Sequence, residues 1–271
     1  MKESVSASVE VITRRVEQPF LESWYELADE SHLWFRWRMA AALAQLRRLG
    51  LPLGRSLRAL EVGCGTGVLR SQFEAATSWT VDGADLDYDA LCRAAAAARG
   101  RTLYYDIREE AAGLVEAYDV LILYDVLEHI EDARPFVASL LRHLKPGGLL
   151  LVNVPAVQAL YGDYDRAAGH FRRYDKAGLA REFDGSGVEV VDMRYWGFGL
   201  LPLLLLRELM LKLNRRGSSE EVVRRGFRSP HPLVDKVLGA LMRAESRVLR
   251  NPPLGSSLLM VCRKGASPGR V

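Results

Sequence analysis

The sequence predicts an α/β fold in which a mostly parallel sheet carries helices on both faces. Between residues 57 and 155, short apolar runs of strand length alternate with stretches of helical periodicity, the pattern of a doubly wound sheet. The chain has 271 residues, of which 49% are hydrophobic and 26% are charged, the balance of a globular protein. This length fits one large domain, or one domain with a cap.

Residues 1–50 form the first predicted unit, a helical lid. Apolar and aromatic side chains recur at helical spacing through this stretch. They are Leu21, Trp24, Tyr25, Ala28, Trp34, Trp37, Ala41 and Ala44. Gly50 and Pro52 end the pattern, because neither residue continues a helix well.

The core is expected over residues 51–195. Its predicted strands, in chain order, are 57–62, 79–84, 102–105, 118–124, 149–154 and 188–195. Its predicted helices are 68–75, 88–98, 134–144 and 175–183. The fourth strand reads Tyr-Asp-Val-Leu-Ile-Leu-Tyr, and this nearly continuous apolar run indicates burial on both faces of the sheet.

A helical insertion, residues 196–255, separates the sixth strand from the final strand and tail, residues 256–271. Its apolar stretch over 198–213 is interrupted by Pro202 and is shorter than the ~18 uninterrupted apolar residues of a membrane span. The stretch could pack on the sheet edge or between two copies of the chain, line an apolar substrate tunnel, or lie on a membrane surface. The choice between monomer and homodimer therefore stays open.

Charge and cysteine content exclude several classes of protein. The net charge of +3 is small, so we expect no nucleic-acid partner. The first residues, MKESVSASVEV, lack the apolar core of a signal peptide. Cys64, Cys92 and Cys262 form no CxxC pair, so we expect a cytoplasmic protein with reduced cysteines and no bound metal.

A glycine loop, residues 61–67, follows a predicted strand and opens a predicted helix with the sequence Glu-Val-Gly-Cys-Gly-Thr-Gly. Glycines let the backbone turn sharply and let a ligand approach the main chain. The third glycine comes one residue earlier than in the dinucleotide fingerprint, which disfavours a nicotinamide-dependent dehydrogenase.

Two acids end the next two predicted strands. Asp85 could accept hydrogen bonds from the hydroxyls of a ribose, and Asp106 could accept one from an exocyclic adenine amine. Asp85 could instead cap a helix, or do both, and Asp106 could be an ordinary strand-end acid. Ligands bind at the carboxyl ends of parallel strands, so both acids are expected near the glycine loop.

Five segments together resemble the successive motifs of the class I S-adenosylmethionine-dependent methyltransferases: E-V-G-C-G-T-G, G-A-D-L-D, Y-Y-D-I, Y-D-V-L-I-L-Y-D-V-L-E-H-I and L-K-P-G-G-L-L-L-V-N-V-P. The resemblance covers about residues 57–155 and the last two strands. It is closest to the small-molecule type related to the quinone-biosynthesis methyltransferases. It implies a Rossmann-like sheet of seven strands with the last one antiparallel, S-adenosylmethionine as cofactor and S-adenosylhomocysteine as product.

The resemblance also implies a set of cofactor-binding residues. The glycines would pass under the methionine part, Asp85 would hold the ribose, and Asp106 with Ile107 would frame the adenine. The segment H-L-W-F-R-W-R, residues 32–38, resembles a lid that faces the cofactor, although it could equally be plain amphipathic packing. The implied set is Trp34, Arg38, Glu61, Gly63, Cys64, Gly65, Gly67, Asp85, Leu86, Asp106, Ile107, Tyr124 and Asp125.

Methyl transfer to a hydroxyl needs an in-line geometry and a base, and histidine is the natural base near neutral pH. We expect His170 or His129 to take this role. His129 could instead shape the floor of the cofactor site, and His170 could lie in an ordinary surface loop. Tyr161, Tyr164 and Tyr174 are expected to orient the substrate.

The leading hypothesis is a methyltransferase that acts on a small, apolar-bodied molecule, with oxygen favoured over carbon or nitrogen as acceptor. The alternative is a protein of the same fold that binds the cofactor but catalyses a cyclisation or acts structurally. A macromolecular substrate is disfavoured, because the fourth strand does not end in an Asn/Asp-Pro-Pro-aromatic motif and no Pro-Cys nucleophile is present.

Overall fold

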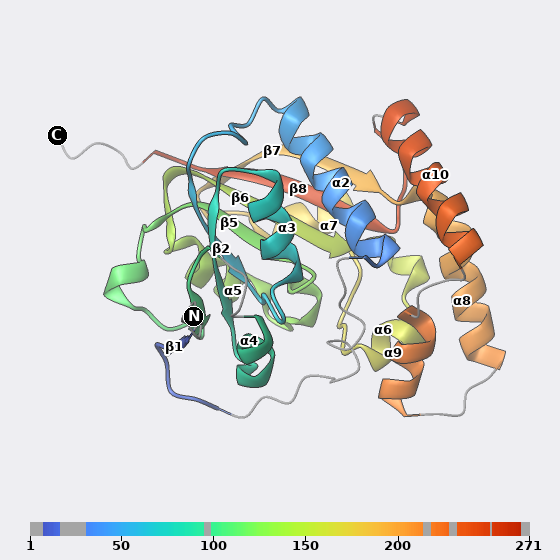
Figure 1. Ribbon diagram of the computed structural model, residues 1–271, viewed down its shortest axis with the longest axis horizontal. Coiled ribbons are helices and arrows are strands. Elements are labelled where there is room, and N and C mark those ends of the chain that lie inside the picture. Colours follow the sequence, from blue (N-terminus) through green and yellow to red (C-terminus); the bar gives the residue numbers. More distant parts are fainter. Residues whose placement is uncertain are drawn as a thin grey trace, which may run out of the picture.

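The computed structural model describes residues 8–16, 31–94, 99–213, 218–227, 232–249 and 251–266. Its centre is an eight-stranded sheet with the order β1-β4-β3-β2-β5-β6-β8-β7 (Figure 1). The strands are β1 (Val9–Val11), β2 (Arg58–Val62), β3 (Thr80–Asp85), β4 (Thr102–Tyr104), β5 (Tyr118–Tyr124), β6 (Leu144–Pro155), β7 (Val188–Trp196) and β8 (Ser257–Lys264). The predicted α/β class is confirmed.

Helices cover both faces of this sheet. The α-helices are α2 (Leu33–Arg48), α3 (Val68–Ala76), α4 (Tyr88–Ala94), α5 (Ala133–Leu141), α6 (Asp163–Ala167), α7 (Lys176–Glu182), α8 (Leu201–Leu213), α9 (Ser219–Phe227) and α10 (Pro232–Val248). On one face α2 and α3 bury Trp37 and Phe73 against the strands. On the other face α5 and α7 bury Val137 and Leu179. These two apolar layers hold the strand ends in fixed positions.

The predicted number of seven strands was wrong, because the sheet formed by the described residues has eight. The additional strand, β1, pairs in parallel with β4 at the sheet edge, with Val9 opposite Thr102. It lies inside residues 1–50, which were predicted to be helical. Three residues reading Val-Glu-Val are too short to show a period, so only the pairing partner reveals the strand. The predicted helical positions 21–28 lie outside the described residues.

The last strand is antiparallel, as predicted. β8 runs antiparallel to both of its neighbours, β6 and β7. This pairing sets Ser257 opposite Pro155, so the start of β8 lies at the carboxyl end of β6. β6 itself begins at Leu144 rather than at the predicted 149, because Leu144 pairs with Tyr118 ahead of an irregularity in the β5–β6 register.

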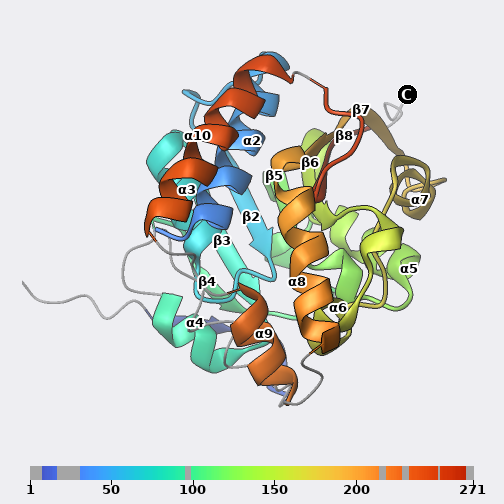
Figure 2. The ribbon, with the colours of Figure 1, turned by 90° about the vertical axis from the view of Figure 1, so that its right-hand side faces the viewer.

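Three helices, α8, α9 and α10, occupy the insertion between β7 and β8. In Figure 2 they face the viewer, in front of the carboxyl ends of the central strands. α10 packs on α2, whereas α8 and α9 pack on α6. Among the described residues, no helix is both long enough and apolar enough to cross a membrane.

Candidate functional site

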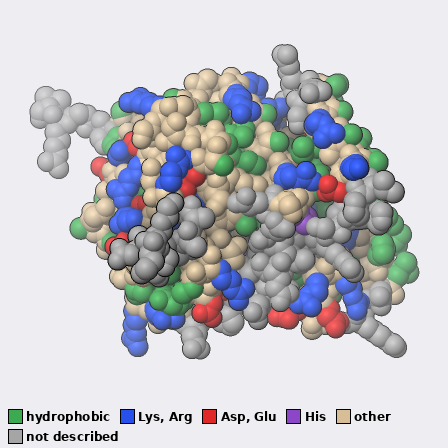
Figure 3. All heavy atoms as spheres, viewed as in Figure 1, with side chains coloured by type: hydrophobic (Ala, Val, Ile, Leu, Met, Phe, Trp, Pro, Cys, Tyr) green, Lys and Arg blue, Asp and Glu red, His purple; other side chains and the backbone are tan. Residues whose placement is uncertain are grey.

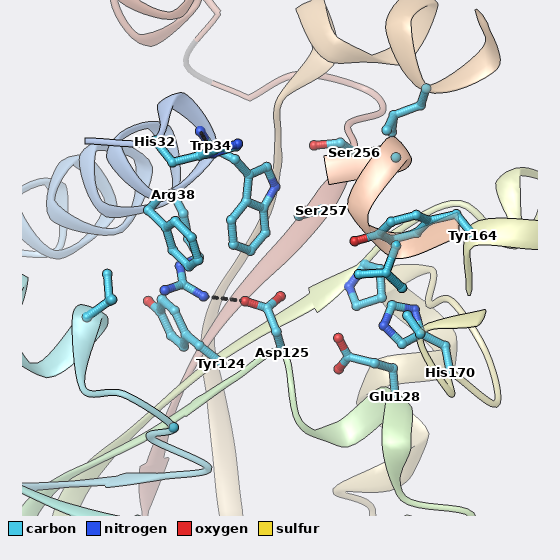
Figure 4. A pocket seen from close by; sticks show the side chains of 18 of the residues that line it. His32, Trp34, Arg38, Tyr124, Asp125, Glu128, Tyr164, His170, Ser256 and Ser257 are labelled. Atoms are coloured by element: carbon cyan, nitrogen blue, oxygen red, sulfur yellow. Dashed lines mark hydrogen bonds and ion pairs between the residues drawn. The ribbon is translucent and has the colours of Figure 1, made fainter. Parts of the chain in front are cut away.

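A cavity of about 690 Å³ lies at the carboxyl ends of β2, β3, β5 and β6. The strand order reverses beside β2, which has β3 on one side and β5 on the other, and such a switch point is where open α/β sheets bind ligands. The glycine loop and the start of α2 form one wall, and α6 with α8, α9 and α10 forms the other. Figure 4 labels ten lining residues, His32, Trp34, Arg38, Tyr124, Asp125, Glu128, Tyr164, His170, Ser256 and Ser257.

The glycine loop adopts a backbone that other residues avoid. Gly63, Gly65 and Gly67 have φ of 74°, 50° and 80°, in the left-handed region. A Cβ atom on Gly63 would collide with the side chain of Val126. Gly63, Cys64 and Gly65 line the cavity, so the bare main chain of the loop forms part of its wall.

Asp85 is held at the cavity wall by three backbone N–H groups. Its Oδ2 accepts from Gly65 N at 2.7 Å, and its Oδ1 accepts from Leu86 N at 2.7 Å and Asp87 N at 2.9 Å. Burial raises the pKa of this carboxyl, although the three hydrogen bonds oppose that shift. A carboxylate offers about four acceptor positions, so one remains on Oδ2 for a ligand hydroxyl. The predicted residues Asp85 and Leu86 both line the cavity.

Glu61 is a buried acid in the same wall. Burial raises its pKa from 4.5 to about 8, although the nearby Arg38 and Arg70 lower it in part. Its Oε2 has no hydrogen-bond partner among the described residues. An unpaired acceptor that faces a cavity favours a ligand with a positive charge or a hydrogen-bond donor at this point.

Arg38 and Asp125 form a buried ion pair across the cavity floor, with 2.5 Å between Nη1 and Oδ2 (Figure 4). The guanidinium carbon of Arg38 lies 4.8 Å from the ring centre of Trp34 and 5.7 Å from that of Tyr124. Asn153 donates to the other oxygen of Asp125 at 2.7 Å. The structure therefore brings together the four predicted residues of α2 and of the carboxyl end of β5, namely Trp34, Arg38, Tyr124 and Asp125.

His170 lies on the opposite side of the cavity. Its Nδ1 is 2.9 Å from Oδ1 of Asp165, and Nε of Arg173 donates to both oxygens of the same carboxylate at 2.9 Å. Although burial favours the neutral acid, the hydrogen bond from His170 and the charge of Arg173 lower the pKa of Asp165 to about 2. Asp165 is therefore an anion that fixes the His170 ring and leaves its Nε2 able to accept a proton.

His129 packs edge-on against His170, with 4.7 Å between the ring centres. Burial and the neighbouring His170 lower the pKa of His129 to about 3, so this ring is neutral near pH 7. Burial and the charge of Asp125 raise the pKa of Glu128 well above its usual range. Potential ligand atoms of Glu128, His129 and His170 lie within 4.8 Å of one another. A metal ion could bridge these three side chains.

Other predicted site residues do not line the cavity. Asp106 forms an ion pair with Arg108 at 2.6 Å, and Ile107 is buried in the core. Gly67 precedes α3 and is also absent from the cavity wall. The remaining ones are Tyr161, which donates to the backbone oxygen of His170 at 2.8 Å, and Tyr174, which donates to that of Leu127 at 3.4 Å.

Tyr164 does line the cavity, and Figure 4 shows its ring beside His170 with the hydroxyl directed into the open space. The residues that sequence reasoning missed are Asp165, Arg173, Glu128, Asn153 and Arg207. Asp165 and Arg173 lie eight residues apart in the sequence, on either side of His170. An acid and a base so near a candidate histidine indicate an ion-paired cluster around it. Arg207 directly follows four leucines, residues 203–206, and a cation at the end of such an apolar run was its sequence signal.

Comparison with known proteins gives a consistent result. A family model described as a methyltransferase domain matches residues 34–193. A ubiquinone biosynthesis O-methyltransferase from Rhizobium leguminosarum is 34% identical over 100 residues, which cover 35% of this chain and 39% of that protein. The chain thus spans about two fifths of the length of the first curated relatives that it matches.

A longer match is found with a protein of Mycolicibacterium smegmatis named "Probable S-adenosylmethionine-dependent methyltransferase". It is 32% identical over 187 residues, which cover 65% of this chain and 68% of that protein. Among solved structures, the 4+2 cyclase SpnF has a TM-score of 0.53 at 19% identity and covers 83% of this chain and 80% of its own. At that identity the likeness concerns the fold alone.

Proposed function

Because the chain belongs to the S-adenosylmethionine-dependent methyltransferase family, we propose that it binds S-adenosylmethionine in the described cavity and methylates a small, apolar-bodied molecule. One observation carries this proposal. A glycine loop with a fixed carboxylate, Asp85, lies at one end of the cavity, and a histidine with its own fixed carboxylate, His170 with Asp165, lies at the other. The end with the glycine loop and Asp85, called the cofactor half, suits a nucleoside. The end with His170 and Asp165, called the acceptor half, suits proton removal.

The residues of the cofactor half fit S-adenosylmethionine. The unpaired oxygen of the buried Glu61 suits a cationic ligand, and Gly63 and Gly65 present bare main chain to the cavity. Asp85 would accept a hydrogen bond from a ribose hydroxyl through its remaining position. Asp106 would have to leave Arg108 before it could accept one from the adenine amine. When bound, the cofactor supplies a methyl group on a sulfonium sulfur, and S-adenosylhomocysteine is the product.

The acceptor half of the cavity supplies the base. His170 would take the proton of the acceptor hydroxyl at Nε2, while Asp165 holds the ring and stabilises its protonated form. His129 is too weak a base near neutral pH and would instead keep the His170 ring in place by its edge-on contact. Tyr164 would orient the acceptor from beside His170, in the same wall. This arrangement favours His170 over His129, the choice that the sequence left open.

The cavity wall indicates the substrate class. α8 contributes Leu203, Leu204 and Met210 to it, and α10 contributes Val234 and Leu238. These side chains suit a substrate with an apolar body. Oxygen is the favoured acceptor, because the geometry provides a base and because the shorter curated matches are named as O-methyltransferases. We place the reaction in the cytoplasm, consistent with the three free cysteines.

The outer face of α8 would contact a membrane surface. Leu205, Leu209 and Leu213 are 58%, 54% and 80% exposed and recur every four residues, so they form one stripe. Residues 196–255 contain eleven Lys and Arg against five Asp and Glu, a net charge of +6, whereas the whole chain carries +3. Figure 3 shows hydrophobic and basic side chains along the right-hand edge, where α8 and α10 lie. Apolar and basic side chains together suit an anionic lipid surface.

Vesicle sedimentation tests this contact. We expect binding to phosphatidylglycerol vesicles that weakens at high salt, and weak binding to phosphatidylcholine vesicles. Leu205→Glu with Leu209→Glu should reduce the binding. Equal binding to both lipids would remove the preference for anionic lipid. Absence of binding to either lipid, or a concentration-dependent dimer that the same two substitutions dissociate, would argue against a membrane role for this face.

Methyl transfer itself is tested with labelled S-adenosylmethionine and a small-molecule extract. We expect a labelled low-molecular-weight product, no label in protein or nucleic acid, and the same rate after treatment with EDTA. Loss of the label on chelation would implicate the cluster at Glu128, His129 and His170 as a metal site. Absence of transfer with every extract, while the cofactor binds, would contradict the proposed reaction.

Cyclisation without methyl transfer is the second candidate, favoured by the fold likeness to the 4+2 cyclase. Mass spectrometry separates the two. A methyltransferase gives a product 14 mass units heavier than its substrate, because CH₃ replaces H, whereas a cyclase gives a product of unchanged mass and no S-adenosylhomocysteine.

A further inference from the structure

Arg207 forms part of the cavity wall near Tyr164. It lies on α8, and its guanidinium carbon stacks over the Tyr164 ring at 3.8 Å from the ring centre. Its Cδ lies 3.4 Å from the position that a Cβ of Gly226 would take, so α6, α8 and α9 enclose the side chain. The Nε atom is buried and has no hydrogen-bond partner among the described residues. A guanidinium held in this way still offers a donor.

The neighbouring charges compensate Arg207 only in part. Its Nη2 is 3.3 Å from Oε1 of Glu208, but Oε2 of that carboxylate already accepts from Asp163 N at 3.0 Å. Arg173 is nearby and carries a second buried positive charge, although Asp165 neutralises it. Burial and the charge of Arg173 lower the pKa of Arg207, despite the opposing effect of Tyr164 and Glu208. The cation therefore gains from an added anion.

The basic character of this part of the cavity extends to its rim. Arg225, on α9, also lines the cavity and pairs with the exposed Glu221 at 3.8 Å. Apolar lining residues of α8, Leu206 and Met210, adjoin Arg207 along the helix. A ligand that satisfies both features carries an anionic group beside an apolar body.

We propose that Arg207 is an anion-binding subsite that recognises a carboxylate or phosphate group on the substrate. That the bound anion is a methyl acceptor rests on the proposed function. That Arg207 binds an anion does not. A charge-assisted bond to the guanidinium anchors the anionic group, and the leucines of α8 hold the apolar part. The subsite thus narrows the substrate class from apolar-bodied molecules to anionic amphiphiles.

Three probes of equal chain length test the subsite: decanoate and decyl phosphate below their micelle-forming concentrations, and decan-1-ol below its solubility limit. Calorimetric titration of the full chain should show decanoate or decyl phosphate bound about tenfold to a hundredfold more tightly than the alcohol. The stronger of the two anions identifies the recognised group. Equal affinity for all three probes would overturn the proposal.

Variants separate recognition from packing. Arg207→Gln should weaken anion binding about tenfold or more and leave decan-1-ol binding within about twofold. Arg207→Lys should restore part of the anion affinity, because it restores the charge. Lys212→Gln, which removes an exposed cation of the same helix, is the matched control and should change nothing. Unchanged decanoate affinity in Arg207→Gln would overturn the subsite.

A purely structural Arg207 predicts a different pattern. If the stack on Tyr164 only anchors α8, then Arg207→Gln and Arg207→Lys should weaken all three probes alike and lower the melting temperature together. Affinity for S-adenosylhomocysteine is measured in parallel. If the wild-type chain ignores that nucleoside but discriminates the anions, the proposed function fails and the subsite stands. The reverse result removes the subsite alone.

Discussion

His170 and Asp165 lie 2.9 Å apart, from Nδ1 to Oδ1, and the carboxylate is fully buried. The carboxylate would be costly to bury alone, but the hydrogen bond from His170 and the ion pair with Arg173 compensate its charge. A histidine with one nitrogen fixed in this way presents the other nitrogen in a constant direction. This is the geometry that a general base needs before substrate arrives.

Replacement of His170 by alanine should reduce turnover by about 10²–10⁴-fold and leave the affinity for S-adenosylhomocysteine unchanged, because the ring is on the acceptor side of the cavity. The matched change, His129→Ala, should reduce turnover less, since the low pKa of His129 makes it a poor base. Steady-state rates and calorimetry check both statements. A larger loss for His129→Ala would reverse the assignment.

Asp165→Asn should destabilise the fold by about 3 kcal/mol, because the buried Arg173 would lose its counter-ion. Asp163→Asn is the control, since Asp163 lies on the same helix and pairs with the exposed Arg166. That variant should lose less than about 1 kcal/mol. Urea unfolding measures both, and similar losses in the two variants would show that the Asp165 cluster is not a buried ion pair of this kind.

Gly63→Ala should destabilise the chain by about 2 kcal/mol or more, because alanine tolerates the positive φ poorly and its Cβ would meet Val126. Adding Val126→Ala should recover the steric part and leave the backbone part. Gly113→Ala, where a Cβ would meet nothing within 4 Å, is the control. If the double variant recovers nothing in chemical unfolding, Val126 does not restrict the loop.

The raised pKa of Glu61 predicts a pH dependence of stability. Between its ordinary value of 4.5 and about 8, the folded chain binds more protons at Glu61 than the unfolded chain does. This contribution to the free energy of unfolding is therefore full below pH 4.5 and is lost as the pH rises through 8. Melting curves of wild type and Glu61→Gln should diverge in that window, with the variant relatively more stable at the higher pH. Parallel curves would contradict the burial of an ionisable Glu61.

Asp85→Asn should weaken binding of S-adenosylhomocysteine about tenfold to a hundredfold, since a hydrogen bond to a charged acceptor is worth about 1.5–3 kcal/mol. Asp89→Asn provides the control, because Asp89 is exposed in the first turn of α4. Calorimetric titration of both variants is the measurement. Equal affinities would remove Asp85 from the ribose site.

Much of the cofactor half could be predicted because its signals are local. The loop at residues 61–67 is one contiguous segment, and parallel strands bring their carboxyl ends to one edge, so Asp85 had to lie near it. Arg38 and Asp125 come from distant segments, and the motif resemblance, rather than any periodicity, indicated both of them. The short strand β1 gave no signal, because three residues cannot display a period.

The acceptor half was less predictable, because its contacts depend on irregular backbone. The segment between β6 and α7 contains His170 and Tyr164, which line the cavity, but also Tyr161 and Tyr174, which bond to backbone oxygens behind it. Nothing in the spacing of these residues distinguishes the two groups. Arg207 lies 42 residues after Asp165 and meets Tyr164 only through the packing of α8 on α6.

Nucleoside binding by the wild-type chain is the property on which the proposed reaction rests. Calorimetric titration with S-adenosylmethionine and with S-adenosylhomocysteine, beside NAD as a control nucleotide, measures it. We predict one site per chain for each of the first two, no heat from NAD, and a higher melting temperature in the presence of either ligand. A folded chain that shows neither heat nor a melting shift with both ligands at about millimolar concentration, where even weak specific binding is visible, would contradict binding of S-adenosylmethionine in this cavity.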